Sequence, residues 1–156
     1  YMSPEEEKLY RSNGGKEAVI PVSEGDVIDL GGRPLLIIDD PGHTPGSIAI
    51  LDETNRVLYS GDSIQSGRIF MFGAHRDLKK YVESLEHLSV YDGRYDLVYP
   101  CHGKLPVYPD LVPQLIRGAK EILDGAAEGQ TVDLFGNQVC LYQFPFAGFL
   151  CEMPSK

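Results

Sequence analysis

Three residues that can bind metal each follow a strand-like run of the sequence. His43 follows the apolar run 35–38, Asp62 follows the run 57–60, and His102 follows the run 97–99. Imidazole nitrogen and carboxylate oxygen are ligands that zinc, iron and manganese share. Three such side chains at strand ends predict a metal site on the rim of a sheet.

The loop that carries His43 is rich in residues that stiffen or bend a chain. Pro41 and Pro45 restrict φ at two positions, while Gly42 and Gly46 permit tight bends. A metal ligand must be held in place by its surroundings, and a stiff loop does this. We therefore favour a functional role for His43 over that of an ordinary polar surface residue.

The other two candidates have plainer alternatives. Asp62 is a candidate to bridge two cations, because a carboxylate has two oxygens and hydrolytic two-metal sites place their ions about 3.5–4 Å apart. An aspartate after a strand also commonly forms a turn or caps a helix. His102 is either a ligand or a half-buried histidine bonded to backbone. Each signal is weak alone, and the three together are moderately specific.

Four further features receive modest interpretations. His75 precedes a predicted helix and is a weak candidate for a substrate contact. His87 lies on the polar side of that helix and is expected to be solvated. Cys101 is expected to be a buried, inert thiol, because successive strand residues point to opposite faces. The segment Gly67–Gly73 is either a flap over a pocket or a packed surface loop.

The elements that position these residues begin with a predicted antiparallel meander. Its strands are expected at 27–30, 35–38, 47–51 and 57–60. Short connections make consecutive strands antiparallel neighbours, so alternate strands run the same way. The C-terminal ends that carry His43 and Asp62 should therefore lie on the same rim.

Helices and later strands complete an α/β architecture in one domain, residues 1–156. We expect a peripheral helix within residues 1–15, with Ser3 as its N-cap and Glu6 completing a capping box, and a motif-bearing core over 22–125. The core includes helices at 77–88 and at about 110–124 and a strand at 97–99. Closing strands are expected within 131–152, at 139–144 and 149–151, as edge strands. The expected apolar stripes are Leu78, Val82, Leu85 and Leu88 in one helix and Leu115, Ala119, Ile122 and Leu123 in the other.

Composition excludes several classes of partner. The formal net charge of −9 argues against nucleic acid or an anionic membrane surface, since both require positive charge. We find no apolar run near the 18 residues of a membrane span and no signal peptide. The three cysteines show no CxxC pattern and suit a reducing cytoplasm. A small-molecule substrate and a cytoplasmic location are expected.

The motifs resemble those of a known family. Pro-Gly-His43-Thr-Pro-Gly-Ser, Leu-Tyr-Ser-Gly-Asp62 and Tyr-Pro-Cys-His102-Gly are similar to the third, fourth and fifth metal motifs of the metallo-β-lactamase superfamily. The glyoxalase II-like and general hydrolase branches are closer than the true lactamases. The match covers roughly residues 22–125 in order and spacing.

This resemblance implies a fold, a cofactor and a reaction. The fold is an αββα sandwich, and the cofactor is two zinc ions, with iron or manganese as alternatives. A metal-activated water attacks an ester, thioester, lactone, amide or phosphoester. His43 belongs to the first metal and His102 to the second, and Asp62 bridges them as the catalytic carboxylate.

One part of the family pattern is absent, because no HxHxDH motif occurs. The chain therefore resembles only the second half of the sandwich, a mixed sheet with helices on one face. Tyr1 precedes Met2, which fits a truncated piece, and a natural half-protein is the other interpretation. We expect an uncovered apolar sheet face, and a homo-oligomer or a complementary N-terminal half as partner. A non-catalytic association module and an iron-dependent redox protein of the same fold stay open.

Overall fold

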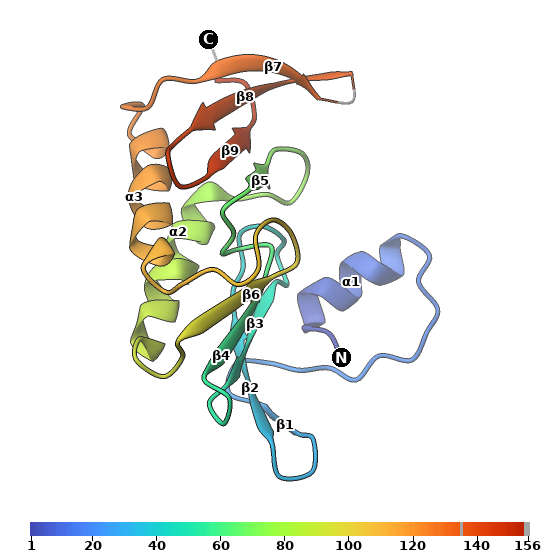
Figure 1. Cartoon of the computed structure of the whole chain (residues 1–156). Coiled ribbons are helices and arrows are strands. Elements are labelled where there is room, and N and C mark those ends of the chain that lie inside the picture. The colour runs from blue at the N-terminus through green and yellow to red at the C-terminus, as the bar shows by residue number, and fades with distance from the viewer. Residues whose placement is uncertain (135, 155–156) are drawn as a thin grey trace.

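A computed structural model describes residues 1–134 and 136–154, which form two β-sheets and their covering helices (Figure 1). The elements follow one another as α1 (Pro4–Ser12), β1 (Val27–Asp29), β2 (Pro34–Asp39), β3 (Ile48–Asp52), β4 (Val57–Gly61), β5 (Arg68–Met71), α2 (Leu78–Leu88), η1 (Ser89–Tyr91), β6 (Leu97–Pro100), α3 (Leu111–Leu123), β7 (Gln130–Leu134), β8 (Asn137–Gln143) and β9 (Gly148–Cys151).

The five-stranded sheet has the order β1-β2-β3-β4-β6 and carries all three predicted ligands at its strand ends. Strands β1 to β4 form the predicted antiparallel meander. Strand β6 pairs with β4 in parallel. Because β2, β4 and β6 run the same way, the segments that follow them leave the sheet at one rim. The meander and its shared rim are thus confirmed.

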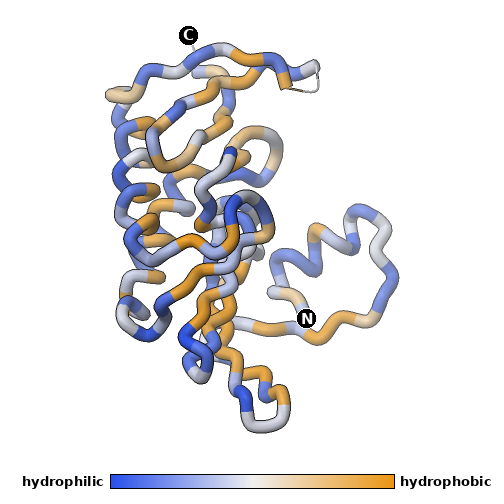
Figure 2. The backbone as a smooth tube through the Cα atoms, viewed as in Figure 1, coloured by the Kyte–Doolittle hydropathy of each residue, from blue (hydrophilic) through white to orange (hydrophobic). Residues whose placement is uncertain are grey.

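Helices α2 and α3 cover one face of this sheet, where they lie side by side (Figure 1). The apolar stripe of α2 is buried at Val82, Leu85 and Leu88, and α3 buries Leu115 and Ala119. Hydrophobic residues lie along the strands of this sheet, as Figure 2 shows. The mixed sheet with helices on one face agrees with the predicted fold class. Leu123 was wrongly assigned to the stripe of α3: it is the last helical residue and is 47% exposed.

The second sheet has the order β5-β9-β8-β7, and two predictions fail there. Strands β8 and β9 are interior strands, and β5 and β7 form the edges. The segment Gly67–Gly73 was expected to be a flap or loop, but most of it is strand β5, which pairs in parallel with β9. Its buried Ile69 and Met71 alternate with exposed Arg68 and Phe70, the period of a strand.

Helix α1 lies on the other side of the five-stranded sheet from α2 and α3 (Figure 1). Its predicted cap is present, since the Glu6 amide donates to Ser3 Oγ at 3.2 Å. The reciprocal half of the capping box does not form. The Glu6 carboxylate instead accepts a hydrogen bond from the Thr44 hydroxyl at 2.7 Å. The helix buries none of its own residues, yet it is bonded to the loop that carries His43.

The face of the five-stranded sheet away from α2 and α3 is partly open. Ile50, Tyr59 and Tyr99 are neighbours across β3, β4 and β6. Both tyrosines are 37% exposed, and their ring centroids lie 6.1 Å apart. This row is part of the uncovered apolar face expected from the sequence.

In the part of the chain that the structure describes, the helices are too short or too polar to cross a bilayer.

Candidate metal centre

The structure brings His43, Asp62 and His102 together at the rim of the five-stranded sheet. The two oxygens of Asp62 face different histidines. Oδ2 lies 3.6 Å from His43 Nε2, and Oδ1 lies 3.4 Å from His102 Nε2. The carboxylate therefore stands between the imidazoles with one oxygen directed to each.

Both N···O distances are longer than a hydrogen bond and close to the distance between two ligand atoms of one metal ion. An N–H···O hydrogen bond is typically about 2.9 Å long. Two atoms bound tetrahedrally to zinc at about 2.0–2.1 Å stand roughly 3.3 Å apart. The donor set of nitrogen and oxygen also fits zinc, iron or manganese. The residues present therefore fit a metal pair that shares Asp62.

The same arrangement supplies two protein ligands to each ion. Among residues 1–134 and 136–154, no group of three or more His, Cys, Asp or Glu side chains is placed to hold one ion. A catalytic zinc usually has three protein ligands. With two ligands for each ion, the described residues alone would fall short of such a site.

Burial differs sharply between the two histidines. The His43 side chain is 13% exposed, the Asp62 side chain 30%, and the His102 side chain 73%. His43 is thus enclosed by the fold. His102 lies in the turn after β6 and faces solvent, more exposed than the half-buried position weighed from the sequence.

The environment of His43 favours its neutral form. Burial lowers the pKa of the imidazole, and the nearby Arg76 charge lowers it further, while Asp62 raises it. The Phe70 backbone also raises the pKa, although buried His43 Nδ1 has no hydrogen bond of standard geometry in the described chain. A metal ligand must be deprotonated, so a depressed histidine pKa prepares the ring for coordination.

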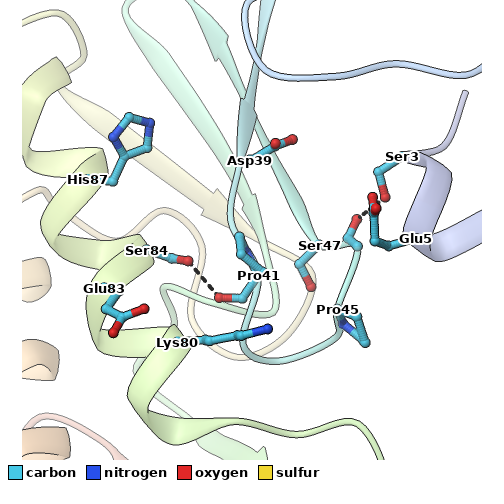
Figure 3. A pocket seen from close by; sticks show the side chains of 11 residues that line it. Ser3, Glu5, Asp39, Pro41, Pro45, Ser47, Lys80, Glu83, Ser84 and His87 are labelled. Atoms are coloured by element: carbon cyan, nitrogen blue, oxygen red, sulfur yellow. Dashed lines mark hydrogen bonds between the residues drawn. The ribbon is translucent and has the colours of Figure 1, made fainter.

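The loop around His43 is held from both sides, as Figure 3 shows. On one side the Ser84 hydroxyl of α2 donates to the Pro41 carbonyl oxygen at 2.6 Å. On the other, the buried Ser3 hydroxyl donates to the Gly46 carbonyl oxygen at 2.8 Å. The stiffness inferred from prolines and glycines is therefore reinforced by bonds from two helices.

Removal of the Ser3 hydroxyl is expected to destabilise the protein measurably. Ser3→Ala deletes both the cap of α1 and the bond to Gly46, for a loss of about 1–2 kcal/mol in the free energy of unfolding. Ser12→Ala is the control, because that hydroxyl is exposed and bonds only within α1. Urea denaturation measures both, and equal losses would contradict a tie between α1 and the loop.

Directly before the loop, Asp40 is a buried carboxyl group without a partner. It is 1% exposed, and neither oxygen has a hydrogen bond of standard geometry in the described chain. Burial raises the pKa of Asp40 to about 7, and Ser63 partly opposes that shift. A carboxyl group that stays largely protonated up to about pH 7 therefore lies three residues from His43.

The remaining candidates lie away from the three residues. His75 is exposed with φ of 74° and lines a shallow hollow with Pro45 and Lys80, so it does not face the histidine pair. His87 is half exposed and contacts Glu24 at 3.1 Å. Cys101 was wrongly predicted to be buried. It is exposed, because β6 ends at Pro100 and the alternation of faces no longer applies.

A hollow of about 430 Å³ opens beside the three residues. Its walls include Gln65 and Arg76, which were not singled out from the sequence, and Phe70, which lies in the segment Gly67–Gly73 weighed as a flap over a pocket. Arg76 belongs to no sequence motif, so its place beside the three candidate ligands could not be predicted. The signal for Phe70 was the alternation 68–71, which identifies the strand that directs this side chain outward.

Comparisons with known proteins identify the family of the chain. The family model of the metallo-beta-lactamase superfamily matches residues 1–102. The chain therefore belongs to the metallo-beta-lactamase superfamily.

Curated relatives resemble this chain over part of their length. The acyl-coenzyme A thioesterase MBLAC2 of Gallus gallus is 36% identical over 83 residues, which are 52% of this chain and 30% of that protein. A hydroxyacylglutathione hydrolase of Ruegeria pomeroyi is 43% identical over 54 residues, 33% of this chain and 21% of that protein. The chain thus spans about a third or less of the length of these relatives.

Solved structures show the same fold. A metallo-beta-lactamase from Pontibacter korlensis superposes with a TM-score of 0.64 at 18% identity, over 76% of this chain and 56% of that chain. The protein TTHA1623, solved in a di-iron-bound form, superposes with a TM-score of 0.59 at 26% identity, over 74% of this chain and 62% of that chain. These likenesses agree with the two sheets and their helices.

Proposed function

We propose that the protein is a metal-dependent hydrolase and that this chain carries half of its dinuclear site. His43 belongs to one ion, His102 belongs to the other, and Asp62 lies between them. The observation that carries the proposal is the placement of the two Asp62 oxygens, one toward each imidazole nitrogen. A metal bound there supplies an activated water and polarises the scissile bond.

Zinc is the proposed metal, with iron and manganese as alternatives. All three accept nitrogen and oxygen ligands, so the donor set does not separate them. A neighbour in a di-iron-bound form keeps iron open, and with it a redox function for the same fold.

A thioester is the substrate class that we favour among those implied by the family. The names of two relatives describe hydrolysis of acyl-coenzyme A and of hydroxyacylglutathione, and both compounds are thioesters. Esters, lactones, amides and phosphoesters are the other classes that the resemblance implies. A cytoplasmic location is proposed on the free cysteines, Cys101, Cys140 and Cys151.

The missing ligands must come from outside the described half-site. A second copy of this chain has only His75 and His87 to offer beyond the two histidines already placed. A complementary polypeptide segment that contributes histidines is therefore the favoured source over a homo-oligomer. The open face with Tyr59 and Tyr99 is a suitable packing surface, since exposed apolar patches mark association sites.

The proposal predicts that Asp62→Asn weakens zinc binding at least tenfold. The substitution keeps the size of the side chain and removes the charge shared by both ions. Equilibrium dialysis against zinc, followed by elemental analysis, gives the affinity of the chain alone and with a complementary segment. Asp92→Asn is the control, an exposed aspartate after η1.

A non-catalytic association module is the second candidate, favoured by the presence of only two ligands for each ion. His43→Ala separates the two functions. Unchanged metal content and unchanged hydrolysis in the most completely assembled form would support the module and overturn the hydrolase.

A further inference from the structure

Arg76 stands out among the residues around the hollow because one of its guanidinium nitrogens is buried without a hydrogen-bond partner in the described chain. Its Nε is buried without a hydrogen bond, and in the described chain the side chain makes no ion pair. A buried donor left unsatisfied costs about 1–3 kcal/mol. The structure thus contains a cationic donor group whose acceptor is missing.

Four of the other six arginines pair with a carboxylate: Arg11 with Glu7, Arg33 with Asp52, Arg56 with Asp96 and Arg94 with Glu53. Arg68 and Arg117 make no ion pair among the described residues either, but Arg76 is the one arginine there whose Nε is buried without a hydrogen bond. The chain has 23 acidic residues for 14 basic ones, so carboxylates are plentiful. An arginine that stays unpaired in such a chain is available for a ligand.

Arg76 lies at the same hollow as the three candidate ligands. The hollow is lined by His43, Asp62 and His102 together with Arg76, Arg68 and Phe70. The charge of Arg76 acts on the His43 ring, which confirms that the two side chains are close. The Gln65 amide, also in the wall, already donates to the Asp62 carbonyl oxygen.

We propose that Arg76 binds an anionic group of the substrate, a carboxylate or a phosphate, beside the reacting centre. That the ligand is a substrate rests on the hydrolase function proposed above. Arginine presents parallel donors that match the oxygens of carboxylate and phosphate. The net charge of −9 does not attract anions from solution, so a local cation has to provide the recognition.

The first experiment measures anion binding without any hydrolysis. The full chain is kept free of metal by a chelator and titrated with inorganic phosphate and, separately, with acetate, while side-chain Nε–H signals are followed by NMR. We expect a saturable shift of the Arg76 signal, and the stronger of the two probes identifies the anion class. In Arg76→Gln, binding of that probe should weaken at least tenfold.

Two variants make this result decisive. Arg117→Gln removes the same charge from α3, outside the hollow, and should leave the affinity unchanged. Arg68→Gln tests the other arginine of the wall. Retained anion binding in Arg76→Gln, or loss only in Arg68→Gln, overturns the proposal. The proposal is also overturned if Arg76→Gln leaves anion affinity unchanged and only tightens metal binding in a separate titration. Arg76 would then act only on the metal ions.

A second experiment connects the anion site to the substrate. Two thioesters of the same acyl group are compared, one on a thiol that carries a carboxylate and one on a neutral thiol. Arg76→Gln should raise KM for the charged thioester at least tenfold and leave the neutral one unaffected. Equal effects on both overturn the proposal. If the chain assembled with the complementary segment and metal hydrolyses neither thioester, the thioesterase function fails, while the NMR titration still decides the role of Arg76.

Discussion

Gly42→Ala is expected to destabilise the protein by about 3–5 kcal/mol, one of the largest effects of a single methyl group in this chain. Gly42 has φ of 141°, a conformation that residues with a Cβ rarely adopt. An added Cβ would lie 2.5 Å from the backbone N and Cα of Tyr81 in α2. Because both atoms belong to a helix, no flexible side chain can move aside.

Gly31→Ala is the matched control for this substitution. Gly31 also has a positive φ, 85°, but nothing lies within 4 Å of its added Cβ. Gly31→Ala should therefore lower the free energy of unfolding only by the cost of a Cβ at positive φ, about 1–2 kcal/mol. Thermal or urea unfolding of both variants measures the difference. Equal losses would show that the close packing of the His43 loop on α2 contributes nothing.

Asp40→Asn is expected to stabilise the protein at neutral and alkaline pH. The native pKa of Asp40 is about 7, whereas an unfolded aspartate titrates near 3.9. Between these values the native state binds more protons than the unfolded state. Stability therefore falls as pH rises from about 4 to about 7, by up to about 4 kcal/mol, and then levels off. Asparagine carries no charge and removes this loss.

The measurement is the difference between the two proteins at each pH. Urea denaturation from pH 4 to pH 8, with a chelator present, gives free energies of unfolding in which other titrating groups cancel. The variant should match the wild type near pH 4 and exceed it by about 2–4 kcal/mol at pH 8. A constant difference across this range would mean that Asp40 keeps an ordinary pKa in the native protein.

The sequence was sufficient for the elements that depend on local pattern. Apolar runs joined by short turns predicted the meander, and hydrophobic periodicity predicted α2. The shared rim of His43 and Asp62 followed from strand direction alone. The position of His102 on that rim also needed the parallel pairing of β6 with β4, which the structure supplies.

What the sequence did not reveal depends on contacts between distant segments. Glu6 was read as part of a capping box, but its carboxylate bonds to Thr44, 38 residues away. Strand β5 was missed because glycines flank it and its partner, β9, lies at the other end of the chain. Arg76 has no motif at all, and its importance appears only once its lack of a partner is visible.

The bonds between α1 and the His43 loop bear on the order in which the protein folds. Strands β2, β3 and β4 join neighbours in sequence, and such local contacts form early because little chain entropy is lost in closing them. Ser3 and Gly46 are 43 residues apart, so their contact closes a much longer loop. We therefore expect the sheet rim to form before its contact with α1, so that the loop that bears His43 would reach its final rigidity late in folding.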